Sequence, residues 1–339
     1  GQFRLLLRGA VTAGSRWRMA PPAPHAAELA AACGVLPLTA QVLANRGYAA
    51  PAAAQEFLDA PLDTLADPER IVDMPRAAAR VADALAHGDL ITIYGDYDAD
   101  GVTATAVLIR GLRTLGARTA WYVPSRFREG YGLNADALAR LRADGHRLIV
   151  AVDCGVTAAE EIAQAASAGQ EIIVVDHHEP PAVLPPAVAV VDPKRADQQG
   201  LFHEYAAAGL AFQFLRAVRR RAGVEGTPLE VIDLATLGTI ADVVPLVGDN
   251  RRLARAGLHR MTTEPSTGVA ALIGVAGIVG EITSRHVGFA LAPRLNAAGR
   301  LGDAGAAVRL LLTDDPAEAQ GIAATLDAEN RARQELCQQ

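Results

Sequence analysis

Residues 90–101 read LITIYGDYDADG, an apolar run followed directly by three aspartates and a glycine. Apolar positions with helical spacing continue through residues 102–115. This order predicts a buried strand, a turn and a helix. The pattern recurs with apolar runs at 119–123, 148–152 and 172–175 and helical stretches at 135–143 and 158–168. Strands and helices therefore alternate through this part of the chain.

Short apolar strands that alternate with helices are typical of a parallel sheet covered on both faces. We therefore expect an α/β fold, with a doubly wound parallel sheet of at least four strands and flanking helices over residues 87–192. Helical patterns then follow one another through residues 193–315, which predicts a mainly helical section. We expect residues 87–315 to form one domain and residues 1–86, which are Ala-rich and interrupted by prolines, to form an N-terminal helical lead-in.

The chain ends in a helical pattern that has no stop signal. Residues 316–339 begin with proline, which is favoured at helix starts, and finish with DAENRARQELCQQ, which contains no capping glycine. The first residue is Gly1 rather than Met. We therefore expect residues 316–339 to be the start of a connector helix that leads into a further domain.

Composition excludes several classes of protein. The 339 residues are 50% hydrophobic and 21% charged, which is the usage of a globular protein and not of a disordered or fibrous one. The formal charge of −6 argues against nucleic-acid binding by bulk attraction alone, although a local basic groove remains compatible with it. Cys33, Cys154 and Cys337 form no CxxC pair, which excludes a disulfide framework and favours a reducing cytoplasm. No run of eighteen apolar residues occurs, so we expect no membrane span.

Acids and histidines follow three of the predicted strands. In an open parallel sheet, ligands bind beyond the carboxyl ends of the strands. The residues that come directly after strand ends there are Asp96, Asp98, Asp100, Asp153, Asp176, His177 and His178. Carboxylates that lie within about 4–6 Å of one another raise each other's pKa, so such a group needs cations to stay ionised.

Divalent metal ions are the better candidates for those cations. No arginine or lysine occurs in residues 96–102, 153–156 or 176–180. Carboxylates mixed with imidazoles suit Mn²⁺ or Mg²⁺ better than a structural zinc site, which would favour cysteine. Two such ions about 3.5–4 Å apart can hold a phosphoryl oxygen and activate water near neutral pH. The sequence therefore predicts two-metal hydrolysis of a phosphate ester or anhydride.

Each of these features has a simpler interpretation when it is taken alone. The turn DYDADG can be a solvated loop or a helix N-cap, and Asp153 can cap the helix that follows its strand. Adjacent histidines at a strand end are only a modest metal signal. Cys154 is best interpreted as a small buried residue, because no histidine is arranged with it for thiol catalysis. The placement of all these groups at successive strand ends favours the metal site.

The motifs resemble those of a known family. The four stretches GDYDADG (95–101), VDCG (152–155), DHH (176–178) and GTIADVVPL (238–246) are similar to the four signatures of the DHH phosphoesterase superfamily. GYGLN (130–134) and APRLNAAGRL (292–301) narrow the resemblance to the RecJ branch, the single-strand-specific exonucleases. The similarity runs from about Trp17 to the end of the chain. It identifies residues 87–315 as a DHH catalytic domain.

The resemblance implies a set of metal ligands for two Mn²⁺ or Mg²⁺ ions. Those ligands are Asp98, Asp100, Asp153, His177 and Asp242. It also implies that Asp153 bridges both ions and acts with His178 as a catalytic residue near the scissile phosphate. Asp96 and Asp176 lie within the motifs but have no assigned role. Tyr94 stands where related phosphoesterases often place a metal-binding histidine, so one ion would either be held more loosely or have its coordination completed by water.

Two stretches imply how the substrate is held. The candidates for substrate binding in residues 125–134 and 292–301 are Arg126, Arg294, Asn296 and Arg300, with Arg128 nearby. By similarity, Arg126 and Arg300 are the best candidates for gripping DNA phosphates or a 5′ end. The alternative is that each arginine lies on a solvated surface.

The function implied by the resemblance is 5′-to-3′ degradation of single-stranded DNA to 5′-mononucleotides in DNA repair and recombination. The implied partners are single-stranded DNA, a single-strand-binding protein and a helicase, and the connector helix would lead to a DHH-associated domain and an OB fold. Two alternatives remain. One is a sibling phosphodiesterase for short oligonucleotides or cyclic dinucleotides, or a pyrophosphatase. The other is a non-catalytic DNA-binding scaffold.

Overall fold

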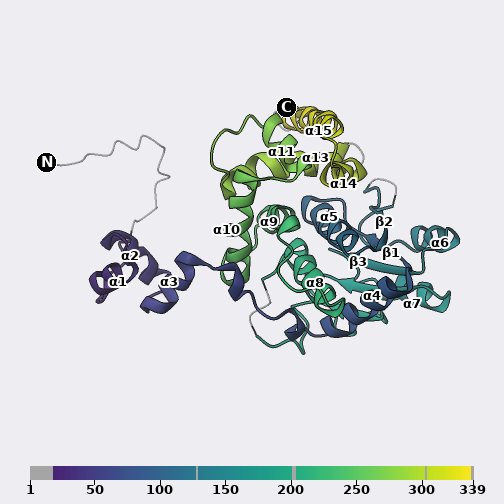
Figure 1. Ribbon diagram of the computed structural model, residues 1–339, viewed down its shortest axis with the longest axis horizontal. Helices are drawn as coiled ribbons and strands as arrows, with labels where there is room; N and C mark the ends of the chain where they lie inside the picture. Colours follow the sequence, from purple (N-terminus) through teal and green to yellow (C-terminus); the bar gives the residue numbers. More distant parts are fainter. Residues whose placement is uncertain (1–17, 127–128, 201–203, 302–303, 337–339) are drawn as a thin grey trace. The chain divides into compact units, whose positions relative to one another are not determined.

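The computed structural model describes residues 18–126, 129–200, 204–301 and 304–336 (Figure 1). The chain divides into two compact units, Gly1–Asp59 and Ala60–Gln339. The predicted N-terminal lead-in ends at residue 86, whereas residues 60–86 lie in the second unit. The reason is that helix α4 (Met74–His87) buries Met74, Val81 and several alanines in the core beside the sheet.

The first unit is a small helical cluster. Its helices are α1 (Ala26–Cys33), α2 (Pro37–Asn45) and α3 (Pro51–Asp59). They bury Leu29, Leu43 and Ala54, and the rings of Tyr48 and Phe57 lie 4.3 Å apart beside this core. No single described helix is long and apolar enough to span a membrane, and the one pair that passes on length and composition, α1 with α2, is bent by 111°.

The second unit is built on a five-stranded sheet in which every pairing is parallel. Its strands are β1 (Leu90–Tyr94), β2 (Arg118–Tyr122), β3 (Leu148–Val152), β4 (Glu171–Val175) and β5 (Ala189–Val191). Their order across the sheet is β2-β1-β3-β4-β5. The predicted doubly wound α/β fold is therefore confirmed, with the short β5 as an additional edge strand.

Side chains alternate between the two faces of the sheet, and each face has its own core. Ile93, Val150 and Val175 pack against α4, α5 (Ala99–Thr114) and α8 (Ala207–Arg221). Tyr94, Ala151 and Val174 pack on the other face against α6 (Ala135–Ala143) and α7 (Ala159–Ser167). Burial on both faces explains why the strands are almost continuously apolar in sequence.

The chain after the sheet is mainly helical, as predicted. The α-helices after α8 are α9 (Ile232–Ala241), α10 (Gly248–Thr263), α11 (Thr267–Val275), α12 (Ser284–His286), α13 (Ala292–Leu301), α14 (Ala304–Leu312) and α15 (Pro316–Leu336). A π-helical turn, η4 (Val287–Leu291), leads into α13, and short 3₁₀ turns are η1 (Leu62–Thr64), η2 (Pro68–Arg70) and η3 (Leu229–Val231). The long helix α15 packs against α11 and α13 rather than projecting alone.

Candidate metal centre

The candidate residues gather where the order of the sheet reverses. The chain passes from β1 to β2 on one side and then returns to β3 on the other side of β1. Tyr94 at the end of β1 is paired with Ala151, and Val152 at the end of β3 is paired with Val175. The loops after β1, β3 and β4 therefore emerge beside one another, at the position where open α/β sheets bind their ligands.

The loop after β1 is fixed by backbone hydrogen bonds to its own aspartates. Asp98 caps α5, because its Oδ1 accepts hydrogen bonds from the N–H groups of Asp100 and Gly101 at 2.9 and 3.0 Å. Asp100 is buried and accepts the N–H groups of Ala207 and Ala208 at the start of α8. The helix-cap interpretation of this motif is thus true of Asp98, and it holds the carboxylates in place without excluding a metal.

Asp153, His177 and Asp242 converge from three different elements. His177 Nε2 lies 3.1 Å from Asp153 Oδ1 and 3.6 Å from Asp100 Oδ2, and its Nδ1 lies 3.7 Å from Asp242 Oδ2. Asp242 is the C-cap of α9, and α9 packs against α5 and α8. This packing brings Asp242 to the strand-end residues, although the two positions are far apart in sequence.

Three sets of these side chains have the spacing that a metal ion needs. In each set, one ligand atom per residue lies within 4.8 Å of the others. The sets are Asp153, His177 and His178; Asp100, His177 and Asp242; and Asp96, Asp98 and Asp153. Asp153 and His177 each belong to two sets, so neighbouring ions could share ligands here.

The charges of the cluster favour a cation. Burial, with repulsion from Asp98, raises the pKa of Asp96 to about 7 and that of Asp242 to about 6. Burial and neighbouring carboxylates also raise the pKa values of Asp100 and Asp153 well above their usual range. Burial lowers the pKa of His177 to about 4, which keeps its imidazole neutral and able to act as a ligand.

A buried carboxylate oxygen also favours a bound cation. Asp96 is buried, and its Oδ1 has no hydrogen-bond partner among the described residues. A buried oxygen without a partner is costly, and a bound cation would relieve that cost. The donor set of carboxylates with imidazole suits Mn²⁺ or Mg²⁺. The residues present therefore fit a pair of such ions.

Asp176 and His178 form a second pair beside the cluster. His178 Nδ1 lies 2.7 Å from Asp176 Oδ1, and the Asp176 carboxylate also accepts the N–H groups of Val156, His177 and His178. Burial alone would raise the pKa of Asp176, but these hydrogen bonds hold it below its usual range. The hydrogen bond to the Asp176 carboxylate in turn raises the pKa of His178. The pair therefore favours a protonated His178.

Two residues at the same edge of the sheet were missed by sequence reasoning. The Tyr131 hydroxyl donates to the carbonyl oxygen of Asp153 at 3.3 Å and lies 3.3 Å from both ring nitrogens of His178. Asp192, directly after β5, is buried with an unpaired Oδ2, and burial raises its pKa to about 7. Its position after an apolar strand was a usable signal, whereas the GYGLN motif marked the segment of Tyr131 but not the contacts of its side chain.

The backbone is strained at two points of the site. Asp153 has φ 62° and Val243 has φ 61°, and both are among only four non-glycine residues of the described chain with positive φ. This left-handed region is unfavourable for residues with side chains, especially β-branched ones. Such strain persists where the surrounding structure imposes it, and it concentrates at functional sites.

The predicted substrate-binding residues lie in different surroundings. Arg126 is exposed, with its guanidinium carbon 5.3 Å from the centre of the Tyr97 ring. Arg294 instead pairs with Asp327 of α15 at 2.8 Å and donates to the carbonyl of Ala290. Arg128 and the side chain of Arg300 lie outside the described residues. Between the two arginines whose side chains the structure describes, Arg126 lies beside the metal loop.

Asn296 supports the metal loop directly. Its Oδ1 accepts the N–H of Ala99, the residue between the ligand candidates Asp98 and Asp100, at 2.8 Å. One turn further along α13, Gly299 lies against the backbone of Tyr97, where an added Cβ would come within 2.6 Å of the carbonyl oxygen. The APRLNAAGRL motif thus forms a helix that packs on the loop after β1.

Glu129 anchors the segment that carries Arg126 and Tyr131. Its carboxylate accepts hydrogen bonds from the Tyr122 hydroxyl, the Arg140 guanidinium and the Ser125 N–H. Tyr122 lies at the end of β2 and Arg140 lies in α6, so both partners belong to regular elements. This network holds both ends of the segment beside the cluster.

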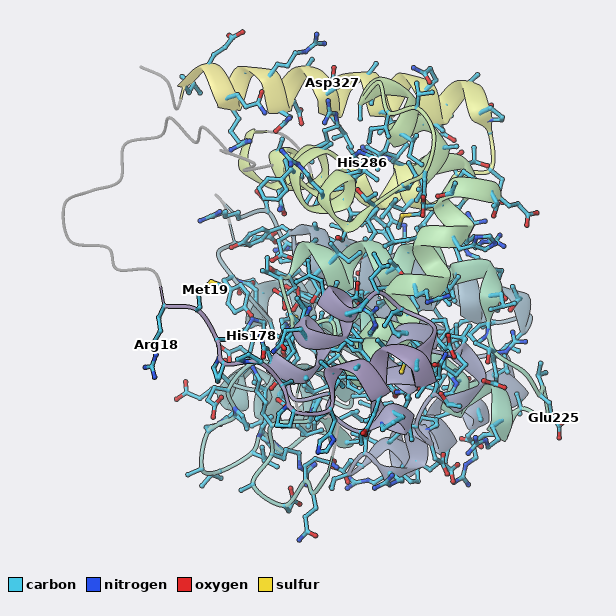
Figure 2. All side chains as sticks on the ribbon, turned by 90° about the vertical axis from the view of Figure 1, so that its left-hand side faces the viewer. Arg18, Met19, His178, Glu225, His286 and Asp327 are labelled. Carbon is cyan, nitrogen blue, oxygen red and sulfur yellow. The ribbon has the colours of Figure 1, made fainter. Side chains whose placement is uncertain are left out.

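Figure 2 shows His178 in the half of the second unit that contains the sheet, and His286 and Asp327 in the helical half.

Comparison with known proteins agrees with this geometry. Residues 90–239 match the family described as "DHH family, N-terminal domain". The single-stranded-DNA-specific exonuclease RecJ of Bacillus subtilis is 40% identical over 89% of this chain, and that of Thermus thermophilus is 41% identical over 95%. The chain spans 38% and 46% of the length of these two relatives, which is less than half of each.

Solved structures of RecJ proteins also resemble this chain. A crystal structure of exonuclease RecJ bound to manganese superposes with a TM-score of 0.73 and 42% identity, covering 78% of this chain and 67% of that one. The manganese complex of RecJ from Thermus thermophilus gives a TM-score of 0.80 at 39% identity, covering 93% of this chain and 45% of that one. The fold, the arrangement of the site and these similarities together show that the chain belongs to the RecJ family of DHH proteins.

Proposed function

We propose that this chain is the catalytic part of a single-stranded-DNA-specific exonuclease that degrades DNA from 5′ to 3′ and releases 5′-mononucleotides. The observation that carries the proposal is the convergence of Asp98, Asp153, His177 and Asp242 at the switch point of a RecJ fold. The two relatives named above are single-stranded-DNA-specific exonucleases, and two solved RecJ structures contain manganese.

The acids and His177 would hold two Mn²⁺ or Mg²⁺ ions. The ligands would be Asp98, Asp100, Asp153, His177 and Asp242, with Asp153 shared between the ions. When bound, such ions hold phosphoryl oxygens and lower the pKa of water to near neutrality. Asp153 and His177 are buried where the cluster meets the sheet, so the substrate phosphate must approach the cluster from the side that faces away from the sheet.

The remaining groups act on the DNA itself. His178, whose pKa is raised by its hydrogen bond to Asp176, is placed to stabilise negative charge on the scissile phosphate and to give a proton to the departing 3′ oxygen. Tyr131 holds His178 through its hydroxyl. Arg126 would bind the terminal phosphate, because a guanidinium pairs well with phosphate oxygens. Arg294, Asn296 and Arg300 remain further candidates, with Asn296 acting through the metal loop.

The proposal extends to the setting of the activity. We place the protein in the cytoplasm, in DNA repair and recombination, with a single-strand-binding protein and a helicase as partners. Helix α15 would connect to a DHH-associated domain and an OB fold. The length of the relatives supports this connection, because the chain covers less than half of the two named above.

The test is Mn²⁺-dependent degradation of 5′-phosphorylated single-stranded DNA, compared with duplex DNA, pyrophosphate and a cyclic dinucleotide. The protein should be tested as this chain and in its full natural length. We expect mononucleotides from single strands at least about tenfold faster than from duplex. Equal rates on duplex would contradict the assignment, preference for a small substrate would favour the sibling phosphodiesterases, and tight binding without turnover would favour the scaffold.

A prediction for Arg126 separates phosphate binding from chemistry. Arg126→Ala should lower kcat/KM on 5′-phosphorylated DNA by about tenfold, with a smaller effect on 5′-hydroxyl DNA, because one charge-assisted contact contributes about 1.5–3 kcal/mol. Arg142→Ala, which removes an exposed arginine of α6, is the matched control. An equal loss on both substrates would show that Arg126 does not bind the 5′ phosphate.

A further inference from the structure

An apolar pocket lies beside the end of α9, the helix that is capped by Asp242. It has a volume of about 640 Å³ and lies between the end of α9 and the helical turns α12 and η4. Its lining includes Ile240, Val243, Leu246, Arg285 and Phe289. This volume falls within the ~300–1,000 Å³ that is usual for pockets that bind small molecules.

The chain neighbours of a metal-ligand candidate line the pocket. Ala241 and Val243 both line it, and the residue between them is Asp242. Val243 is held at φ 61°, with 86% of its surface exposed. A β-branched side chain in this conformation is strained. The strained turn therefore directs Asp242 to the cluster and leaves Val243 on the wall of the pocket.

The opposite wall carries an exposed aromatic ring. Phe289 is 82% exposed and lies in the π-helical turn η4, which packs against α9. π-Helical turns are rare and are frequent at functional sites. Arg285, an exposed cation one turn earlier, lies at the same pocket. An apolar wall, a free aromatic face and a cation are the features that single-stranded nucleic acids use.

We propose that this pocket holds a nucleobase of the single strand whose phosphate lies on the metal cluster. The base would stack on Phe289, and Arg285 would lie near the sugar-phosphate backbone of the same strand. The inference rests on the proposed function and adds a subsite to it. A base has a flat apolar face whatever its identity, so the subsite tolerates every sequence. In a duplex the faces of each base are covered by its neighbours, so the pocket favours single strands over duplex.

The experiment combines an abasic scan with substitution of Phe289. Single-stranded oligonucleotides with one abasic position each, moved stepwise from the 5′ end, are degraded by the natural full-length protein and by Phe289→Ala, and kcat/KM is measured. We expect one position at which loss of the base lowers kcat/KM on the order of tenfold in the natural protein but hardly at all in Phe289→Ala. Phe289→Trp should restore the dependence on the base.

A second readout reports stacking without turnover. A 2-aminopurine at the position found by the scan should be quenched on binding to the natural protein and to Phe289→Trp, but not to Phe289→Ala. Leu229→Ala is the matched control, because Leu229 is an apolar residue, 50% exposed, in η3 outside the pocket. Since Phe289 is exposed, its replacement should leave the thermal unfolding midpoint within a few degrees.

The outcomes separate the subsite from the function. Degradation of single strands with no position coupled to Phe289 would overturn the subsite and leave the proposed function intact. If Leu229→Ala lost the dependence on the base as fully as Phe289→Ala does, that result would also overturn the subsite. Absence of degradation by the full-length natural protein would remove the proposed function and the subsite together.

Discussion

Asp153 is the residue on which the site depends most. It is only 2% exposed, its backbone is held at φ 62°, and its carboxylate belongs to two of the three metal-like sets. Its N–H continues the sheet by donating to the carbonyl of Val175. The sheet thus imposes the strained conformation, and the conformation places the carboxylate between neighbouring ligand sets.

Replacement of this carboxylate should abolish hydrolysis. Asp153→Asn keeps the size of the side chain but removes its charge, and we expect kcat on single-stranded DNA to fall by more than about 100-fold, since even supporting residues of metal sites contribute about 10–100-fold. Asp144→Asn, at the exposed C-cap of α6, is the control and should stay within about twofold. Near-normal turnover by Asp153→Asn would contradict a shared ligand at this position.

Sequence reasoning located the residues that follow strands and missed those brought in by packing. Asp98, Asp153 and His177 could be placed together because parallel strands end at one edge of a sheet. Asp242 could not be placed this way, because it reaches the cluster through the packing of α9 on α5 and α8, and only its motif marked it. The motif that contains Tyr131 was recognised, but the contacts of its hydroxyl could not be predicted, because its partners come from the loops after β3 and β4.

Helix α13 determines the shape of the metal loop at the level of elements. Residues 292–301 were predicted to hold the substrate through Arg294, Asn296 and Arg300. The close approach at Gly299 is to the carbonyl of Tyr97, and Asn296 binds the N–H of Ala99. The motif could be recognised from sequence, but its packing partner lies far away along the chain and had no local signal.

Substitution of Gly299 tests this packing. Gly299→Ala would place a Cβ 2.6 Å from a backbone oxygen and should destabilise the protein by about 1–3 kcal/mol, with weaker Mn²⁺ binding. Gly321→Ala is the control, because Gly321 lies within α15 with no atom within 4 Å of the added Cβ, and it should stabilise the protein by about 0.5–1 kcal/mol. Urea unfolding and Mn²⁺ titration measure both effects. Equal stability of the two variants would contradict a close contact between α13 and the loop.

The carboxylate cluster makes the stability of the whole molecule depend on pH. In the folded state the pKa of Asp96 is raised to about 7, mainly by burial, and that of His178 is raised by Asp176. The folded protein therefore binds more protons than the unfolded chain as pH rises from 6.5 to 8, and stability without metal falls over this range. His177 contributes with the opposite sign, but its contribution fades above the ordinary pKa of 6.5, where the imidazole of the unfolded chain loses its proton.

Metal binding should reverse this dependence, because ligands must be deprotonated before they bind. In EDTA we expect the unfolding midpoint to fall between pH 6.5 and 8. With saturating Mn²⁺ the increase in the midpoint should be larger at pH 8 than at pH 6.5. Calorimetry at both pH values measures this, and Asp96→Asn should flatten the curve in EDTA. A midpoint in EDTA that rises over this range would contradict the charge balance described here.

The most direct test is to count the ions. Equilibrium dialysis with Mn²⁺, combined with electron paramagnetic resonance of the bound fraction, should give two ions per chain that are close enough to couple magnetically. Asp153→Asn should weaken both and abolish the coupling. Binding of no ion, or binding that Asp153→Asn and Asp242→Asn leave unchanged, would contradict the claim that these side chains together form a two-metal site.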